Sequence, residues 1–451
     1  MWQQNYIPLG SLALSAAGAA LPLFVLLYLL GIRRTPAWKA ALAGLAMAAL
    51  VALLIYRMPA GLALSAAACG AAFGLLPIGW IVFTAILLYR IVVDTGKFEI
   101  IKDSIGSLTS DRRLQALLVA FSFGAFLEGA AGFGAPVAVA AAMLTGLGFS
   151  PFYAAAICLL ANTAPVAFGS IGIPVITLEA VTGLPLMKLS AGVGRICAPI
   201  SVLVPAYLIG VMGGWRAMKR VLAAILACGV SFAATQLLVS NFMGPQLTDI
   251  LGSLVSMSAL VLLLLIWKPK DSFELEGGRA ATHLPVRHPA SKILLAWAPY
   301  GILVVMVLLW GAFKTELGKT TLLIPWPHLH EQVIQMPPVV PSPTPYRAIY
   351  RFEWLAAAGT ACLFASILAA FLLRVSPLRF FKILGATGRQ LLFSELTIAS
   401  VLALAYLMNY CGATATLGLA FATTGALFPF FSALLGWLGA VISVRRHLAG
   451  A

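Results

Sequence analysis

The chain has 451 residues, of which 61% are hydrophobic and only 10% charged, and its formal net charge is +15. Soluble domains carry roughly 25% charged residues, so this composition excludes an ordinary soluble protein. The basic residues lie in short segments between hydrophobic stretches. Nucleic-acid binding would need a continuous basic face, and the sequence therefore predicts no nucleic-acid partner.

Apolar stretches long enough to cross a bilayer recur along the chain. A hydrocarbon core of about 30 Å needs about 20 helical residues. The clearest examples are residues 12–30, 38–56, 221–239, 251–267, 293–312, 355–373 and 391–408. We therefore predict an all-α fold, a polytopic transmembrane bundle of about 11–13 membrane segments embedded in lipid.

Basic residues gather in alternate connections between these stretches. The clusters fall at 33–39, 90–113, 216–220, 268–292 and 374–389, whereas the connection 240–249 has no Lys or Arg. Cytoplasmic loops collect Lys and Arg, which predicts that all five clusters face the cytoplasm and that the N-terminus lies outside. The chain between Arg113 and Arg216 must then cross the membrane an even number of times.

A lone acid, Glu128, lies in the apolar stretch FLEGAAGFGAPVAVA. Ionisable groups in membrane segments are rare and usually functional, although a neutral or paired carboxyl that only joins helices is the alternative. Gly129, Gly132, Gly134 and Pro136 follow it, and such residues interrupt helices. We predict that residues 114–149 form a discontinuous helix or a helical hairpin. The start of a half-helix would offer free N–H groups to an anion.

A second interrupted stretch, NTAPVAFGSIGIPVIT, begins with Asn162 and Thr163 and contains Gly169 and Gly172. Paired Gly/Pro-interrupted segments are the best sequence indication of a transporter's substrate site. The alternative is that these small residues only allow close helix packing. We predict that both interrupted stretches line the substrate site.

Two further charged residues lie within or near apolar stretches. Arg195 can bind an anionic substrate, pair with Glu128, or extend toward lipid headgroups. Glu395 is a candidate second proton site, or an acid at a solvated helix end.

Other functions find little support. The six cysteines lie singly, no Cys/His metal spacing is present, and the sequence predicts no cofactor, no metal and no catalytic residue. An intramembrane enzyme would need a nucleophile with a base, or a metal cluster, and neither is visible. The proline-rich connection 313–353 predicts a non-helical excursion outside the cytoplasm, with an interdomain linker as the alternative.

Several blocks resemble those of bacterial L-lactate permeases. They are WQQNYIPLG, FGAFLEGAAGFGAPVAVAAAML, ANTAPVAFGSIGIPV, SNFMGPQLTDILGSLVS, MPPVV and LMNYCGATATLGLA, and the resemblance runs from residue 2 to about Gly439. It implies a multi-pass protein of the bacterial inner membrane that takes up L-lactate with protons, and also D-lactate and glycolate. The implied partners are a small monocarboxylate and protons; the oligomeric state is left open.

The end of the chain departs from this family. Residues 1–439 form the permease-like transmembrane domain, whereas the basic tail 440–451 is unrelated to the family's Ser/Thr/Asn-rich continuation. We therefore expect a truncated or frame-shifted product, so the alternatives to proton symport are an inactive fragment and a monocarboxylate channel. In a permease that has the family's C-terminal part, we expect Glu128 to accept the co-transported proton. Asn162 or Thr163 is expected to contact the substrate hydroxyl.

Overall fold

A computed structural model of the protein describes residues 1–130, 132, 135–269, 271, 273, 286, 288–428, 430 and 432. The predicted domain boundary after residue 439, the tail 440–451 and Gly134 lie outside the described residues. The chain divides into two compact units. Unit 1 comprises Met1–Trp80, Glu316–Ala356 and Gly388–Ala451, and unit 2 comprises Ile81–Thr315 and Ala357–Thr387.

The fold is helical, as the composition predicts. In the described part of the chain, nine helices are long and apolar enough to span a membrane, and one bent pair of shorter helices brings the number to ten. Three shorter apolar helices accompany them. The predicted number of about 11–13 membrane segments is reached among the described residues only when the three shorter helices are counted with the spans.

Unit 1 combines apolar helices with small strands. Its helices are α1 (Leu12–Leu27), α2 (Ala37–Leu50), α3 (Ala60–Phe73), the second part of α17 (Pro377–Cys411) and α18 (Ala413–Ala422). The first three continue through π-helical turns at Tyr28–Ile32, Val51–Ile55 and Gly74–Gly79. Helix α1 packs against α2 and α18.

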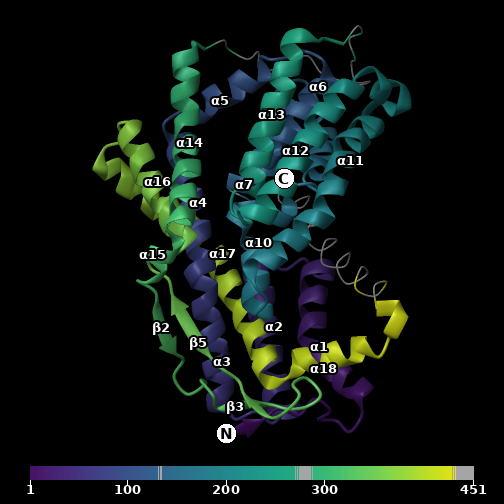
Figure 1. The fold of residues 1–451 in the computed structure, drawn as a ribbon, viewed down its shortest axis with the longest axis vertical. Coiled ribbons are helices and arrows are strands. Elements are labelled where there is room, and N and C mark those ends of the chain that lie inside the picture. The colour runs from purple at the N-terminus through teal and green to yellow at the C-terminus, as the bar shows by residue number, and fades with distance from the viewer. Residues whose placement is uncertain are drawn as a thin grey trace. The chain divides into compact units, whose positions relative to one another are not determined.

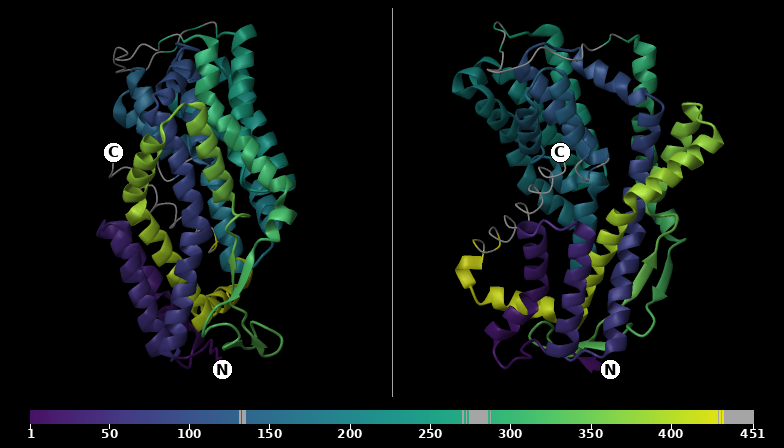
Figure 2. Two further views of the ribbon diagram at one scale, coloured as in Figure 1. Left: turned by 90° about the vertical axis from the view of Figure 1, so that its left-hand side faces the viewer. Right: turned by 180° about the vertical axis from the view of Figure 1, so that it is seen from behind.

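The proline-rich excursion belongs to unit 1 and is mostly non-helical, which confirms this part of the prediction. After the short helix α15 (Lys314–Gly318), it forms two small sheets, drawn in green in Figure 2. Strand β3 (Val333–Gln335) pairs in parallel with β1 (Trp2–Gln3) and antiparallel with β4 (Thr344–Pro345). Strand β2 (Leu322–Pro325) pairs antiparallel with β5 (Ile349–Phe352).

Side-chain hydrogen bonds attach the N-terminal segment to the rest of unit 1. Gln4 donates to the carbonyls of Asn409 and Tyr410, each at 2.9 Å. The Tyr6 hydroxyl donates to Gln4 at 2.9 Å and accepts from the backbone N–H of Met336 at 3.1 Å. The polar residues before the first span therefore hold the N-terminal segment in place by hydrogen bonds to distant parts of unit 1.

Unit 2 is built around a buried helical segment. Its elements are α4 (Trp80–Asp94), α5 (Lys97–Gly106), α6 (Arg112–Gln115), the π-helical segment Ala116–Phe123, α7 (Gly124–Ala130), α8 (Ala135–Gly146), α9 (Pro151–Ala161), α10 (Gly169–Thr182), α11 (Leu186–Arg220), α12 (Leu222–Phe242), α13 (Thr248–Ile266), α14 (Ala290–Ala312), α16 (Ala358–Leu372) and the start of α17. Helices α11, α12 and α13 lie side by side (Figure 1).

The chain folds back within the predicted discontinuous stretch. Helix α8 packs against both α7 and the π-helical segment before it. Residues 112–130 and α8 therefore form a helical hairpin, one of the two predicted forms. The stretch is too rich in glycine to continue as a single rod.

Ion pairs connect the basic loops of unit 2. Asp271 binds Arg113 at 3.2 Å and Arg220 at 2.7 Å, and Asp103 contacts His288 at 2.9 Å. The hydrogen bond from Arg220, together with Arg113, lowers the pKa of Asp271. Three predicted basic connections thus lie at one end of the unit. The even number of membrane crossings between Arg113 and Arg216 stays a prediction.

Candidate functional site

Glu128 lies near the end of the buried helical segment of unit 2. Its side chain is 7% exposed. The apolar window of Arg112–Ala130 is 100% buried, compared with 22–56% for the other eight candidate spans in the described chain. The carboxyl therefore lies inside the protein and does not face lipid, the position in which intramembrane acids are usually functional.

Both predicted interrupted stretches reach this carboxyl. The Asn162 side chain, at the end of α9, hydrogen-bonds to Glu128. Gly169, at the start of α10, lies so close that a Cβ there would collide with the Glu128 carboxylate. The predicted pairing of the two stretches is thus present in unit 2, and a glycine is needed at 169 for the acid to fit.

The backbone is strained where α10 begins. Helix α9 and the segment Val166–Glu179 are bent by 68° relative to each other. Ser170, Ile171 and Gly172 have φ values of 48°, 59° and 77°, all in the left-handed region. Such a conformation costs of order 1–3 kcal/mol for a residue with a side chain and is often found at ligand sites. Regular helix follows, with Pro174 in its first turn.

The loop and first turn of α13 complete this region. A Cβ added at Gly172 would lie 2.8 Å from the backbone of Pro245, and one added at Gly129 would lie 2.9 Å from the Cβ of Asp249. The same added Cβ at Gly129 would lie 3.0 Å from Ile250. The glycines therefore bring α7, α10 and α13 into near-contact around the acid.

Asp249 is a site residue that the sequence analysis does not single out. It is 1% exposed, and neither of its carboxyl oxygens has a hydrogen-bond partner among the described residues. It is close enough to Glu128 for the two carboxyls to interact electrostatically. A signal was available, because the acid lies in the block SNFMGPQLTDILGSLVS, but its place between apolar runs suggested an ordinary loop.

Two helix starts lie beside these acids. In neither α10 nor α13 does a side chain cap the N-terminus. The first N–H groups of a helix have no intrahelical partner and carry partial positive charge. This end of each helix can bind a small carboxylate.

The remaining predicted site residues of unit 2 differ in whether they reach the region around Glu128. Gly132 approaches Ser170, so it joins the region, whereas Thr163 is exposed in the turn after Asn162. Arg195 is exposed on α11, where its Nε donates to the Asn241 side chain at 3.0 Å and not to Glu128.

Glu395 belongs to unit 1. Its position near the start of the apolar run 391–408 suggests a helix end. In the structure, however, Glu395 lies in the middle of the long helix α17. A Cβ at Gly79 would collide with its carboxylate, and its Oε1 has no hydrogen-bond partner among the described residues.

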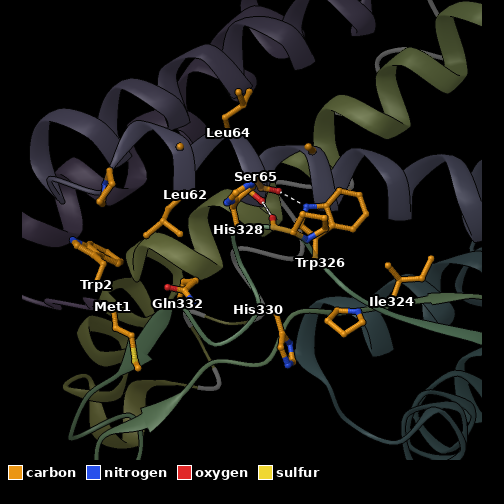
Figure 3. A pocket seen from close by; sticks show the side chains of 15 residues that line it. Met1, Trp2, Leu62, Leu64, Ser65, Ile324, Trp326, His328, His330 and Gln332 are labelled. Carbon is orange, nitrogen blue, oxygen red and sulfur yellow. Dashed lines mark hydrogen bonds between the residues drawn. The ribbon is translucent and has the colours of Figure 1, made fainter.

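A groove in unit 1 is a separate feature (Figure 3). It has a volume of about 1570 Å³ and is lined by the N-terminus, the start of α3 and the strand region 324–332. Trp326 Nε1 donates to the carbonyl of Ser65 at 3.0 Å, and the Ser65 hydroxyl donates to the carbonyl of Pro327 at 2.6 Å. The groove exceeds the roughly 300–1,000 Å³ of typical small-ligand sites and holds no buried acid, so we place the candidate site in unit 2.

Apolar spans, two interrupted helical stretches and buried acids at their meeting point define a class: a polytopic membrane protein with the features of a transporter. The sequence profile of the L-lactate permease family matches residues 15–445. The chain therefore belongs to the L-lactate permease family. It is a transporter and not an enzyme, and a multi-pass protein of the bacterial inner membrane.

Individual relatives agree with this assignment. The chain is 46% identical to the L-lactate permease of Bacillus subtilis, over 98% of this chain and 83% of the relative. It is 43% identical to the L-lactate permease of Escherichia coli K12, with the same coverage. Glycolate permease GlcA of Escherichia coli K12 is 42% identical, over 98% of this chain and 82% of the relative. No solved structure matches the chain.

Proposed function

We propose that this protein imports L-lactate across the bacterial inner membrane together with protons, and that D-lactate and glycolate are further substrates. The names of the relatives, L-lactate permease and glycolate permease, support a small 2-hydroxy monocarboxylate. The observation that carries the coupling is the buried Glu128 beside Asn162 and the interrupted helix α10.

The substrate carboxylate binds at the uncapped starts of the interrupted helices. The backbone N–H groups of α10 and α13 supply hydrogen bonds and partial positive charge. The described glycines that predict this site, Gly129, Gly132, Gly169 and Gly172, leave room for the backbone to approach the ligand. Asn162, or Thr163 next to it, hydrogen-bonds the substrate hydroxyl.

Protons are needed because the site is acidic. A lactate anion close to an ionised Glu128 would be repelled strongly, since charges interact more strongly in a low-dielectric interior than in water. No ion pair neutralises Glu128 in the described part of the chain. Protonation of Glu128 removes the repulsion, so proton and anion binding favour each other, and alternating access carries both across.

The basic connections support one orientation of the protein in the membrane. The basic connections that Asp271 and Asp103 join at one end of unit 2 face the cytoplasm in our proposal, and the N-terminus lies outside. Glu395 is retained as a second candidate for proton coupling, because it is a half-buried acid in a membrane helix.

The direct test is uptake of labelled L-lactate by this chain in proteoliposomes with an inward proton gradient. Electroneutral one-to-one symport would accumulate lactate about tenfold per pH unit, because one pH unit corresponds to about 1.36 kcal/mol. A protonophore should abolish the accumulation. Flux that stops at equal concentrations would indicate a channel, and no flux from folded protein an inactive chain; either result would overturn the proposal.

A further inference from the structure

We propose that Asp249 is a second proton-binding residue of the transport cycle and acts with Glu128 as a carboxyl pair. The inference rests on the proposed proton-coupled transport and deepens it, because it assigns a residue on a different helix to the same site. Asp249 lies in the first turn of α13, whereas Glu128 lies in α7.

The Asp249 carboxyl is buried without a compensating partner in the described chain. Asp249 is 1% exposed, and both its oxygens lack hydrogen-bond partners among the described residues. An acid in the first helical turn is often stabilised as an anion by capping or by the helix dipole. Here the side chain caps nothing. Burying an ionised carboxylate without a hydrogen-bond partner is costly, whereas a neutral carboxyl costs far less.

A second carboxyl, that of Glu128, lies beside Asp249. Close approach at Gly129 holds the backbone of α7 against the first turn of α13, and the carboxyls of Glu128 and Asp249 interact electrostatically. Two carboxylates in a low-dielectric site do not both ionise readily and titrate as a pair. A lactate anion at the adjacent helix starts would add a third negative charge.

The described helices that pack against α13 carry no Lys, Arg or His side chain. Helix α13 packs against α7, α10, α12 and the segment Ala116–Phe123. Apart from Glu128, the titratable side chains on these elements are Glu179 near the far end of α10 and Cys228 of α12. Cys197 of α11 is also within electrostatic range of Asp249. No ion pair in the described part of the chain involves Asp249, so protons are the available means of neutralising the pair.

The consequence for binding is quantitative. If lactate binds only when both carboxyls are protonated, its affinity falls with rising pH by up to a hundredfold per unit once both are ionised, that is, tenfold for each proton. Asp249→Asn replaces the protonated carboxyl by a neutral side chain of similar size. This variant should bind lactate, lose affinity by at most about tenfold per pH unit, and retain tighter binding than wild type at alkaline pH.

The experiment is lactate titration of the purified full chain across pH in detergent, by calorimetry in two buffers of different ionisation enthalpy to count protons taken up per lactate. We expect Asp249→Asn and Glu128→Gln each to take up fewer protons than wild type, and the double variant none. Asp94→Asn is the matched control, because Asp94 forms a half-exposed ion pair with Arg379 in the same unit. It should behave as wild type.

Each outcome is decisive. Proton uptake by Asp249→Asn equal to that of wild type would overturn the inference. Loss of lactate binding by folded Asp249→Asn would overturn it as well, because a neutral side chain imitates the protonated acid. Reduced uptake in Asp249→Asn with unchanged uptake in Glu128→Gln would support Asp249 and remove Glu128 from the proposed function. No proton uptake by wild type would refute both.

Discussion

Each unit contains an acid whose carboxyl group lies directly against a glycine of an interrupted helix. In unit 2 the Glu128 carboxyl lies against Gly169, and in unit 1 the Glu395 carboxyl lies against Gly79. Gly79 is the last residue of the segment Gly74–Gly79, in which the backbone at Leu76 is not helical. Their surroundings differ. Glu128 has Asn162 as a hydrogen-bond donor and a nearby acid, whereas Glu395 has an oxygen without a partner among the described residues.

This difference shows what distinguishes a transport site from a tolerated acid. Proximity to glycine is common to both units and follows from the small-residue composition of membrane helices. Left-handed backbone at Ser170 and Ile171, a polar donor and a second acid occur together only around Glu128 in the described chain. Such a combination costs stability and is expected where it serves binding.

Glu128→Gln is the substitution with the largest expected effect on transport. The neutral amide imitates the protonated acid, so lactate should still bind and exchange. Accumulation driven by one pH unit should fall by about tenfold relative to wild type, because the variant cannot release a proton at this position and only Asp249 remains to carry one. Proton-driven uptake and lactate counterflow in the same proteoliposomes measure both quantities. Wild-type accumulation by Glu128→Gln would remove this residue from the proton path.

Gly172→Ala tests whether the tight backbone of unit 2 is required. Its φ of 77° and the approach of Pro245 backbone to 2.8 Å leave no room for a Cβ. The left-handed conformation alone costs an L-residue roughly 1–2 kcal/mol, and the clash adds to this. We expect a lower thermal midpoint of the purified protein and a reduced rate of counterflow.

Gly210→Ala in α11 is the control for this substitution, since nothing lies within 4 Å of a Cβ built there. It should leave both the thermal midpoint and counterflow near their wild-type values. Equal behaviour of the two variants would show that the close contact of α10 with the Pro245 loop is dispensable.

Glu395→Gln tests the other side of the comparison and should have a smaller effect. Glu395 lacks the acidic partner and donor found at Glu128, so we expect a reduced initial rate with an unchanged accumulation ratio. Initial uptake and the steady-state ratio, measured on one vesicle preparation, separate the two quantities. A steady-state ratio that collapses as in Glu128→Gln would instead make Glu395 a coupling residue and the two units functionally alike.

Much of the helical fold follows from local sequence. The first predicted span, 12–30, is observed as the helical segment Leu12–Ile32, because an apolar run of this length has no other way to satisfy its backbone in lipid. The Gly- and Pro-interrupted stretches also carry their own signal, and so does the proline-rich excursion. These features depend on neighbouring residues only.

Features that depend on distant residues were not predictable in this way. Asp249 is separated from Glu128 by five α-helices in the chain, α8 to α12, and its burial becomes apparent only when α13 packs against α7. The sequence does not predict the length of α17 either, since the first part of this helix is basic and resembles a loop. The small sheets pair the N-terminal strand with residues 333–334. No periodicity in either segment specifies that partner.

Arg195→Gln is the mildest test, and it decides between the functions that the sequence leaves open for this residue. Arg195 is exposed and its Nε donates to Asn241, so a substrate contact would require it to leave this partner. Exposed side-chain interactions of this kind contribute little, and we expect the lactate affinity to change by less than about threefold. If Arg195 bound the substrate carboxylate through two hydrogen bonds, its removal would instead lower the lactate affinity roughly tenfold or more, because charged hydrogen bonds contribute about 1.5–3 kcal/mol. Lactate titration of Arg195→Gln and Arg195→Lys distinguishes the two: a large loss in both variants would place Arg195 at the substrate, against the geometry of unit 2.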